Sequence, residues 1–155
     1  MADDVADVVD VREITPPSTR DAFNAMRELR SVFANEADFA RYVDDVLRPE
    51  GYRLAGVFEH GRDDAVAVAG FRVGHGLSWG HYLYVDDLST IPGARRRGHA
   101  SRLLGWLVDE ARRVGCSQLH LDSGVGLDRL AAHRLYFSRD LAITAYHFAR
   151  RLAAR

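Results

Sequence analysis

Lysine is absent from this chain, and cysteine is almost absent. All 21 basic residues are Arg, and Cys116 is the single cysteine among 155 residues. Without Lys the protein has no side chain for Schiff-base chemistry and no Lys general base. One cysteine excludes a disulfide within the chain and gives no sign of an oxidising compartment. The Cys116 thiol lies between Gly115 and Ser117 with no activating group in view, so a packing role is expected.

Long apolar runs and a charge excess are missing as well. No segment approaches the ~20 apolar residues of a membrane span. The acidic N-terminus lacks the basic-then-apolar order of a secretory signal. A formal net charge of −1 argues against a general polyanion binder, because nucleic-acid affinity usually needs a cationic excess. We therefore expect a cytoplasmic protein that binds neither membrane nor nucleic acid.

The composition that remains is typical of a folded protein. Hydrophobic residues make up 47% of the chain and charged residues 28%. At this length one domain is expected, spanning residues 1–155 with a frayed tail at residues 1–7. Seven His residues show no ligand spacing with Cys or paired acids, so no metal site is expected.

Hydrophobic periodicity and turn residues predict six strands and four helices. The expected strands are 8–14, 52–59, 65–73, 81–91, 118–122 and 141–149. The expected helices are 19–30, capped by Ser18 or Thr19, then 35–48 with Asn35 at its start, 100–114 and 127–138. Three consecutive middle strands indicate hairpins, and the later strand–helix–strand indicates a parallel pair. The expected fold is α/β, with one mixed sheet of about six strands flanked by about four helices.

The segment from Leu88 to Ala100 reads LSTIPGARRRGHA. A strand ends, a tight turn follows, and small residues open an amphipathic helix. This arrangement aims backbone N–H groups and the positive end of a helix dipole at one point, as a phosphate or pyrophosphate site requires. The segment has neither the Gly-Lys-Ser/Thr of a Walker loop nor the three-glycine dinucleotide fingerprint.

Arg95-x-x-Gly98-x-Ala100 resembles the Q/R-x-x-G-x-G/A pyrophosphate loop of the GNAT superfamily of acyl-CoA-dependent N-acyltransferases. The preceding residues 87–90 resemble the strand of that family that contacts acyl-CoA. Residues 132–136, Ala-His-Arg-Leu-Tyr, resemble its A-x-x-F/L-Y helix. The motifs cover roughly residues 82–148, and the order of elements before them also fits the family.

The resemblance implies a co-substrate, acetyl-CoA, and a set of residues around it. These are Leu88, Ser89, Thr90, Arg95, Arg96, Arg97, Gly98, His99 and Ala100, together with Arg129 where the family often has Asn. It also implies that a backbone N–H near Leu88 stabilises the oxyanion and that Tyr136 protonates the leaving thiolate. The plainer interpretation of Tyr136 is a core aromatic residue on the last helix.

The base that takes the proton of the amine is less clear from the sequence. Strand alternation places Asp86 on one face and Asp87 on the other. Either acid could act directly or through a water, and we favour Asp86. Both are equally well explained as surface or ion-paired acids.

The sequence thus predicts an N-acetyltransferase that moves acetyl from acetyl-CoA to a primary amine by direct attack in a ternary complex. A catalytically silent acyl-CoA-binding or regulatory module of the same fold is the alternative, and a nucleotide-binding module is a third reading. The acceptor stays open among antibiotics, polyamines, amino acids, protein N-termini and Lys side chains. A single strand after the last helix leaves a free sheet edge, which predicts a homodimer. In the turn before that strand, Asp140 stands where many members have Gly, and Asp tolerates a positive φ better than most residues.

Overall fold

The computed structural model describes residues 9–154, which divide into two compact units. The first unit ends at Leu121 and the second begins at Asp122. Each unit is described by itself below. The single domain expected over residues 1–155 spans both units and stays a prediction, and the expected tail at residues 1–7 lies outside the described residues.

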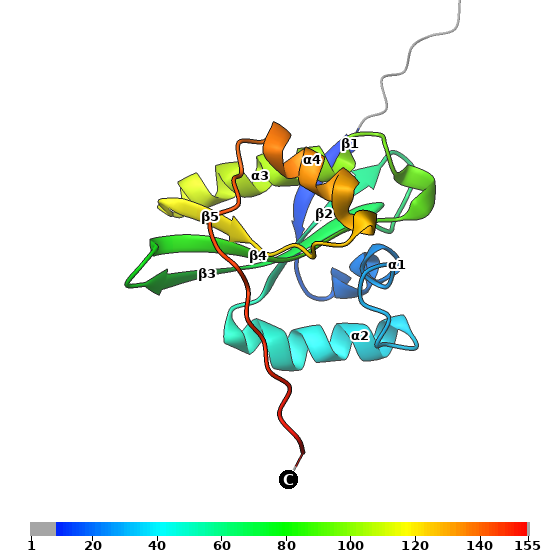
Figure 1. Cartoon of the computed structure of the whole chain (residues 1–155). Coiled ribbons are helices and arrows are strands. Elements are labelled where there is room, and N and C mark those ends of the chain that lie inside the picture. The colour runs from blue at the N-terminus through cyan, green and yellow to red at the C-terminus, as the bar shows by residue number, and fades with distance from the viewer. Residues whose placement is uncertain (1–8, 155) are drawn as a thin grey trace, which may run out of the picture. The chain divides into compact units, whose positions relative to one another are not determined.

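One mixed sheet organises the first unit, with its strands in the order β1-β2-β3-β4-β5 (Figure 1). The strands are β1 (Val9–Ile14), β2 (Arg53–Glu59), β3 (Ala67–Gly76), β4 (Gly80–Thr90) and β5 (Gln118–Leu121). The first four pair antiparallel in chain order, and β5 runs parallel to β4. The predicted mixed α/β fold is confirmed, with five strands where about six were expected.

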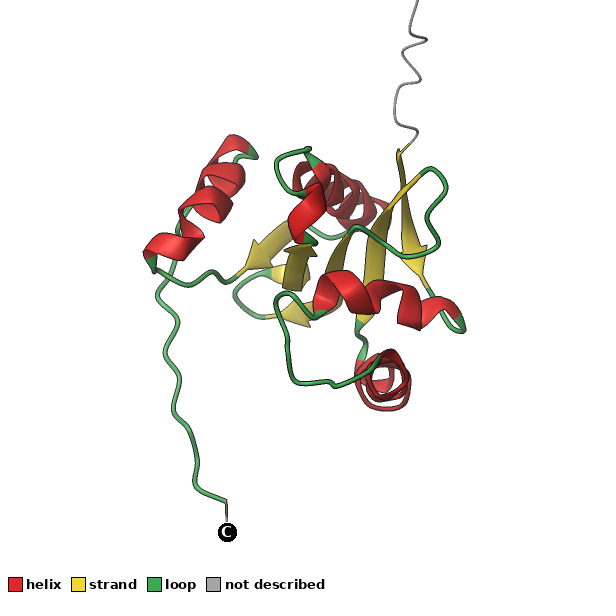
Figure 2. Ribbon diagram, turned by 90° about the vertical axis from the view of Figure 1, so that its right-hand side faces the viewer, coloured by secondary structure: helices red, strands yellow, loops and turns green. Residues whose placement is uncertain are grey.

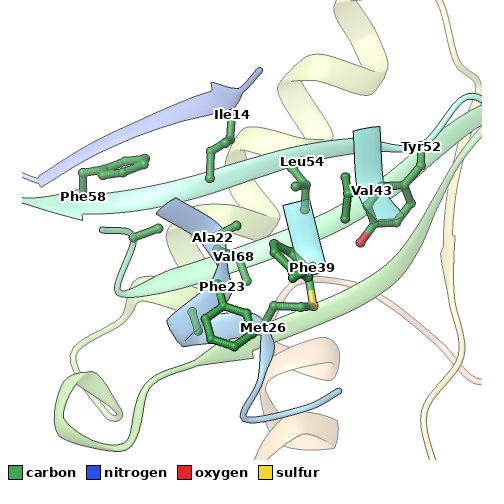
Figure 3. Packing of buried hydrophobic residues seen from close by; sticks show 12 residues of the cluster. Ile14, Ala22, Phe23, Met26, Phe39, Val43, Tyr52, Leu54, Phe58 and Val68 are labelled. Carbon is green, nitrogen blue, oxygen red and sulfur yellow. The ribbon is translucent and has the colours of Figure 1, made fainter. Parts of the chain in front are cut away.

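Helices cover both faces of this sheet. The helices α1 (Phe23–Met26) and α2 (Glu36–Tyr42) lie on one side, and α3 (His99–Arg113) lies on the other (Figures 1 and 2). On the α1/α2 side, aromatic and aliphatic side chains from both helices meet the sheet in one buried cluster (Figure 3). On the opposite face, α3 buries Leu103, Leu104 and Leu107, as its periodicity of three and four residues predicts.

The predicted helix 19–30 is much shorter in the structure. A 3₁₀ turn covers Ser18–Ala22, and α1 has only four residues. The predicted cap is also wrong, because no side chain caps this turn and the Thr19 hydroxyl donates to Asp44 Oδ1 over 2.7 Å instead. Asn35 does cap α2, accepting the backbone N–H of Asp38, and that helix continues as a π turn, Val43–Leu47.

The second unit contains a 3₁₀ turn, Leu127–Arg129, the helix α4 (Leu130–Ser138) and a C-terminal segment. The predicted strand 141–149 is wrong, because residues 141–154 form neither helix nor strand. Apolar alternation alone does not make a strand, which also needs a hydrogen-bonded neighbour. Asp140 has a φ of 61°, which is the left-handed conformation. This conformation was expected, because Asp140 stands where many members of the family have Gly.

No helix within residues 9–154 is both long enough and apolar enough to cross a membrane.

Candidate functional site

A β-bulge in β4 sets the geometry of the site. Gly70 of β3 pairs with Asp87, whereas the next residue, Phe71, pairs with Val85. Asp86 is therefore an extra residue that has no pairing partner on β3. It shifts the alternation of side chains along the strand. The prediction that Asp86 and Asp87 face opposite sides of the sheet is wrong, because both line the same pocket.

This pocket has a volume of about 200 Å³ and lies within the first unit. Its walls combine five charged side chains with one tyrosine and one leucine. They are Arg30, Leu47, Glu50, Tyr52, Arg72, Asp86 and Asp87. Three carboxylates thus face two guanidinium groups beside β4.

Asp87 is held at both of its carboxylate oxygens. The Tyr52 hydroxyl donates to Oδ2 over 2.7 Å, and Arg30 Nε donates to Oδ1 over 2.7 Å. Burial raises the pKa of Tyr52, and the neighbouring Asp87 raises it further. The buried ring lies among the aliphatic residues Val43 and Leu54 (Figure 3). Tyr52 therefore stays protonated and acts as a hydrogen-bond donor to the Asp87 side chain.

Asp86 is paired with a different arginine. Arg72 Nε donates to Asp86 Oδ2 over 3.0 Å and Nη2 donates to Oδ1 over 2.5 Å. This two-point contact fixes the plane of the carboxylate. Arg30 adds a longer contact of 3.3 Å to the backbone carbonyl of Asp86, so the bulge is tied to the segment that follows α1.

Beyond the bulge, one edge of β4 has no neighbouring strand in the sheet. The pairing of β4 with β5 runs only from Tyr82 to Val85, whereas β3 pairs with β4 as far as Thr90. The backbone from Asp86 to Thr90 therefore presents polar groups on the β5 side that the ladder does not use. Leu88, Ser89 and Thr90 lie on this stretch, and the Ser89 hydroxyl is engaged with the Ala25 carbonyl over 2.7 Å.

The loop from β4 to α3 forms an uncapped helix start. Gly98 is the N-cap with a φ of 81°, no side chain caps α3, and its first turn contains no acid. Arg96 also has a positive φ of 62°, and Arg95 and Arg96 are exposed. The first-turn backbone N–H groups and the dipole of a 15-residue helix, with two exposed guanidinium groups beside them, are features that binding of a diphosphate requires.

Two other side chains of this region, Arg97 and His99, contact Glu59 at the end of β2. Arg97 Nη1 lies 2.7 Å and His99 Nε2 lies 3.0 Å from Glu59 Oε1. The His99 ring is buried, and its Nδ1 is a buried atom without a hydrogen-bond partner. Because the His99 ring is buried, only the backbone N–H of His99 is placed to contact an anion. Glu59 holds the loop through its contacts with Arg97 and His99.

The second unit carries Tyr136 on α4. Its side chain is buried, and this burial raises the pKa of the phenol, while a hydrogen bond and the charge of Arg129 act in the opposite direction. Arg129, which stands where the resemblance expects Asn, is therefore a neighbour of the phenol. On the same helix, His133 Nε2 lies 2.8 Å from the Gly124 carbonyl and 3.1 Å from Ser123 Oγ.

Five pocket residues were not predicted from the sequence: Arg30, Leu47, Glu50, Tyr52 and Arg72. They come from three separate segments and share no local motif, so only the tertiary fold brings them together. A Gly at position 70 opposite two consecutive acids is the one signal that could have indicated the bulge. Among residues 9–154, no three His, Cys, Asp or Glu side chains gather as metal ligands.

Sequence matches to known proteins cover most of the chain. Residues 17–140 match the Acetyltransferase (GNAT) family model. The chain is 30% identical over 129 residues to the uncharacterized N-acetyltransferase YhdJ of Bacillus subtilis (strain 168), covering 83% of this chain and 87% of that protein.

Solved structures share the fold at lower identity. An integron cassette protein from the mobile metagenome of V. cholerae has a TM-score of 0.76 at 20% identity, covering 94% of this chain and 93% of that one. The aminoglycoside N-acetyltransferase AAC(6')-Iy in complex with CoA has a TM-score of 0.75 at 12% identity, covering 96% and 97%. With the family match over residues 17–140, these findings show that the chain belongs to the GNAT family of acetyltransferases.

Proposed function

We propose that this acyltransferase moves the acetyl group of acetyl-CoA onto a primary amine by direct attack in a ternary complex. The observation that carries the proposal is the course of β4. From the charged pocket at Asp86 and Asp87, this strand continues along an edge without a neighbouring strand to Thr90, and the loop after it leads to the start of α3. An acceptor pocket and a diphosphate cradle are thereby joined by one stretch of backbone.

Binding of the acyl donor is assigned to this stretch. The diphosphate is held by Arg95, Arg96 and the backbone N–H groups from Gly98 to Ala100. Arg97 contributes to this binding while it stays paired with Glu59. The backbone of residues 88–90 holds the arm that carries the thioester. Arg129 is proposed to contact the same arm while it also binds the Tyr136 hydroxyl.

Acetyl transfer forms one C–N bond, breaks one C–S bond and moves protons among the amine, Tyr136 and solvent. The neutral amine attacks the thioester carbonyl, a C–N bond forms, and the oxyanion accepts a hydrogen bond from a backbone N–H near Leu88. The oxyanion then collapses, the C–S bond breaks, and Tyr136 donates its proton to the sulfur. The nitrogen, which is cationic after the attack, releases one proton to solvent and leaves a neutral amide. The raised pKa of Tyr136 keeps this proton on the phenol at neutral pH. Solvent returns a proton to Tyr136 after the products leave.

Asp86 is proposed to accept the proton of the incoming ammonium through a water. Of the two acids at the bulge, Asp87 already accepts from both Tyr52 and Arg30. Asp86 binds Arg72 alone through its side chain. A water between the amine and Asp86 would let the carboxylate act without leaving Arg72.

The variant Tyr136→Phe tests the proposal. It should lower kcat by about 10²–10⁴-fold, because the thiolate loses its acid. The Kd for acetyl-CoA, measured by calorimetry, should stay within about twofold. Tyr146→Phe serves as the matched control, since Tyr146 is 87% exposed in the C-terminal segment. Equal turnover by Tyr136→Phe and the unchanged chain would remove Tyr136 from the mechanism.

A second candidate function is a silent acyl-CoA-binding module. The observation that favours it is that both acids at the bulge are committed to ion pairs, which leaves no free carboxylate on β4. This candidate gains support if acetyl-CoA binds but no thiol is released with any small amine, peptide or protein acceptor.

The cytoplasmic location expected from the sequence stays a prediction.

A further inference from the structure

We propose that the pocket at the β4 bulge selects a small cationic amine that carries no acidic group next to its reacting nitrogen. This inference rests on the proposed function, because it names the acceptor of the same site. It rests on the pairing of the charges that line the pocket and on the size of the pocket.

The two arginines of the pocket are already committed to acids. Arg72 binds both oxygens of Asp86, and Arg30 binds Asp87 Oδ1 and the Asp86 carbonyl. A carboxylate or phosphate on the acceptor would have to compete for these guanidinium groups with side chains of the protein itself. The Asp86 and Asp87 side chains are only 17% and 12% exposed, so their ion pairs are shielded from solvent more than ordinary surface pairs.

Glu50 is the carboxylate that remains. It lines the pocket and is exposed, and within the described residues it forms neither an ion pair nor a side-chain hydrogen bond. Its charge acts on Arg72 only at longer range. Since two of the three pocket acids are matched by arginines, Glu50 gives the pocket one negative charge in excess. An incoming ammonium gains from this charge, and an acidic group is repelled by it.

The size of the pocket limits the acceptor further. A volume of about 200 Å³ lies below the about 300–1,000 Å³ that is usual for drug-sized ligands. Leu47 supplies an apolar wall, and the Tyr52 ring is buried against the core. The pocket therefore suits a small amine with a short apolar body, or one end of a longer amine.

Amine pairs that differ by one carboxylate test this inference directly. Tyramine and tyrosine, histamine and histidine, and agmatine and arginine each share the reacting primary amine. The full chain is assayed with acetyl-CoA by the release of free thiol. In every pair that is turned over, kcat/KM should be at least about tenfold higher for the amine without the carboxylate, which corresponds to about 1.4 kcal/mol. Equal or higher kcat/KM for the amino acids overturns the inference while the acetyltransferase proposal stands.

Glu50→Gln identifies the residue responsible. This variant should raise KM for the preferred amine about tenfold and narrow the ratio within each pair, with KM for acetyl-CoA unchanged. Glu36→Gln is the matched control, because Glu36 is an exposed acid on α2 that does not line the pocket. An unchanged ratio in Glu50→Gln contradicts the assignment.

Binding measurements keep the two proposals separate. If no amine releases thiol, the Kd of each pair member is measured by calorimetry with CoA present. Tighter binding of the decarboxylated members, weakened by Glu50→Gln, supports the pocket assignment even though the proposed reaction fails. Binding of neither member at millimolar concentration overturns the pocket assignment.

Discussion

At the scale of single residues, Gly70 is the position that makes the pocket. A Cβ built there would lie 1.8 Å from the Tyr52 hydroxyl oxygen and 2.3 Å from its Cζ. The reason for Gly is thus the space that the Tyr52 ring occupies across the face of β3. Because that space is empty of side chain, the Tyr52 hydroxyl can lie within 2.7 Å of Asp87 Oδ2.

Gly70→Ala should lower the free energy of unfolding by about 2 kcal/mol, because the buried Tyr52 ring must move. Loss of the bond from Tyr52 to Asp87 should also raise KM for the amine. Gly93→Ala is the control for stability, since a Cβ at Gly93 meets nothing within 4 Å. Urea unfolding measures the free energy of unfolding of both variants. Equal stability of the two variants would mean that Tyr52 does not hold the bulge.

At the scale of elements, the sequence predicts what depends on long periodic patterns. The helix α3 follows from Leu103, Leu104 and Leu107, and the loop before it follows from the small residues at Gly98 and Ala100. The bulge was not predicted, because the alternation along β4 contains no sign of which residue is extra, and Gly70 on β3 is its one local signal. The helix 19–30 was overestimated, because Thr19 forms a tertiary bond to Asp44 instead of a cap. Local patterns therefore predict the proposed donor site but not the pocket.

Gly98→Ala tests the helix start as a donor site. Position 98 has a φ of 81°, which a residue with a Cβ adopts at a cost of about 1 kcal/mol. We expect KM for acetyl-CoA to rise about fivefold or more as the loop relaxes. Gly61→Ala imposes the same strain, at a φ of 78°, in the turn between β2 and β3. A similar KM for acetyl-CoA in both variants would contradict the proposal that the start of α3 binds the diphosphate.

A second element-scale feature joins three elements through Arg53 of β2. Its guanidinium donates to Glu13 of β1 at 2.7 Å and to Glu110 of α3 at 2.7 Å. Arg113 also donates to Glu110, and these contacts lower the pKa of Glu110 to about 2 from 4.5 despite its burial. The network therefore ties α3 to the sheet through one buried carboxylate.

A lowered pKa stabilises the fold above pH 4.5, and this contribution is lost as the pH falls toward 2. Glu110→Gln should flatten the dependence of unfolding free energy on pH in this window by about 1 kcal/mol, a value reduced for partners that lie partly in solvent. Asp109→Asn, at a 79% exposed side chain, is the control and should leave the slope unchanged. Urea unfolding at stepwise lower pH measures the slopes.

At the scale of the whole molecule, the C-terminal segment is the feature that a single chain leaves unexplained. Ile143, Tyr146, Phe148 and Leu152 are between 76% and 91% exposed, and β5 is an edge strand of the sheet. Apolar side chains gathered in one extended segment are typical of a protein–protein contact. The strand 141–149, whose free edge led to the predicted homodimer, is not formed, so these exposed side chains are the remaining observation in favour of a homodimer, which stays a prediction.

Sedimentation equilibrium of the full chain should give a mass that rises toward the dimer with concentration. Phe148→Asp should shift the equilibrium toward the monomer by about tenfold or more in Kd, because a buried charge is costly. Leu77→Asp, at an equally exposed apolar residue in the turn between β3 and β4, should leave the Kd unchanged. A monomer mass at all concentrations would rule out the homodimer.

The roles proposed for the pocket, the start of α3 and Tyr136 all depend on transfer of an acetyl group to an amine. The full chain is incubated with acetyl-CoA labelled in the acetyl group and with tyramine, histamine and agmatine. Released thiol and labelled amide are then quantified together by mass spectrometry. We expect labelled N-acetyl amine and free thiol to appear in equal amounts. Thiol released without any acetylated amine, or no label transferred to any acceptor, would contradict the account.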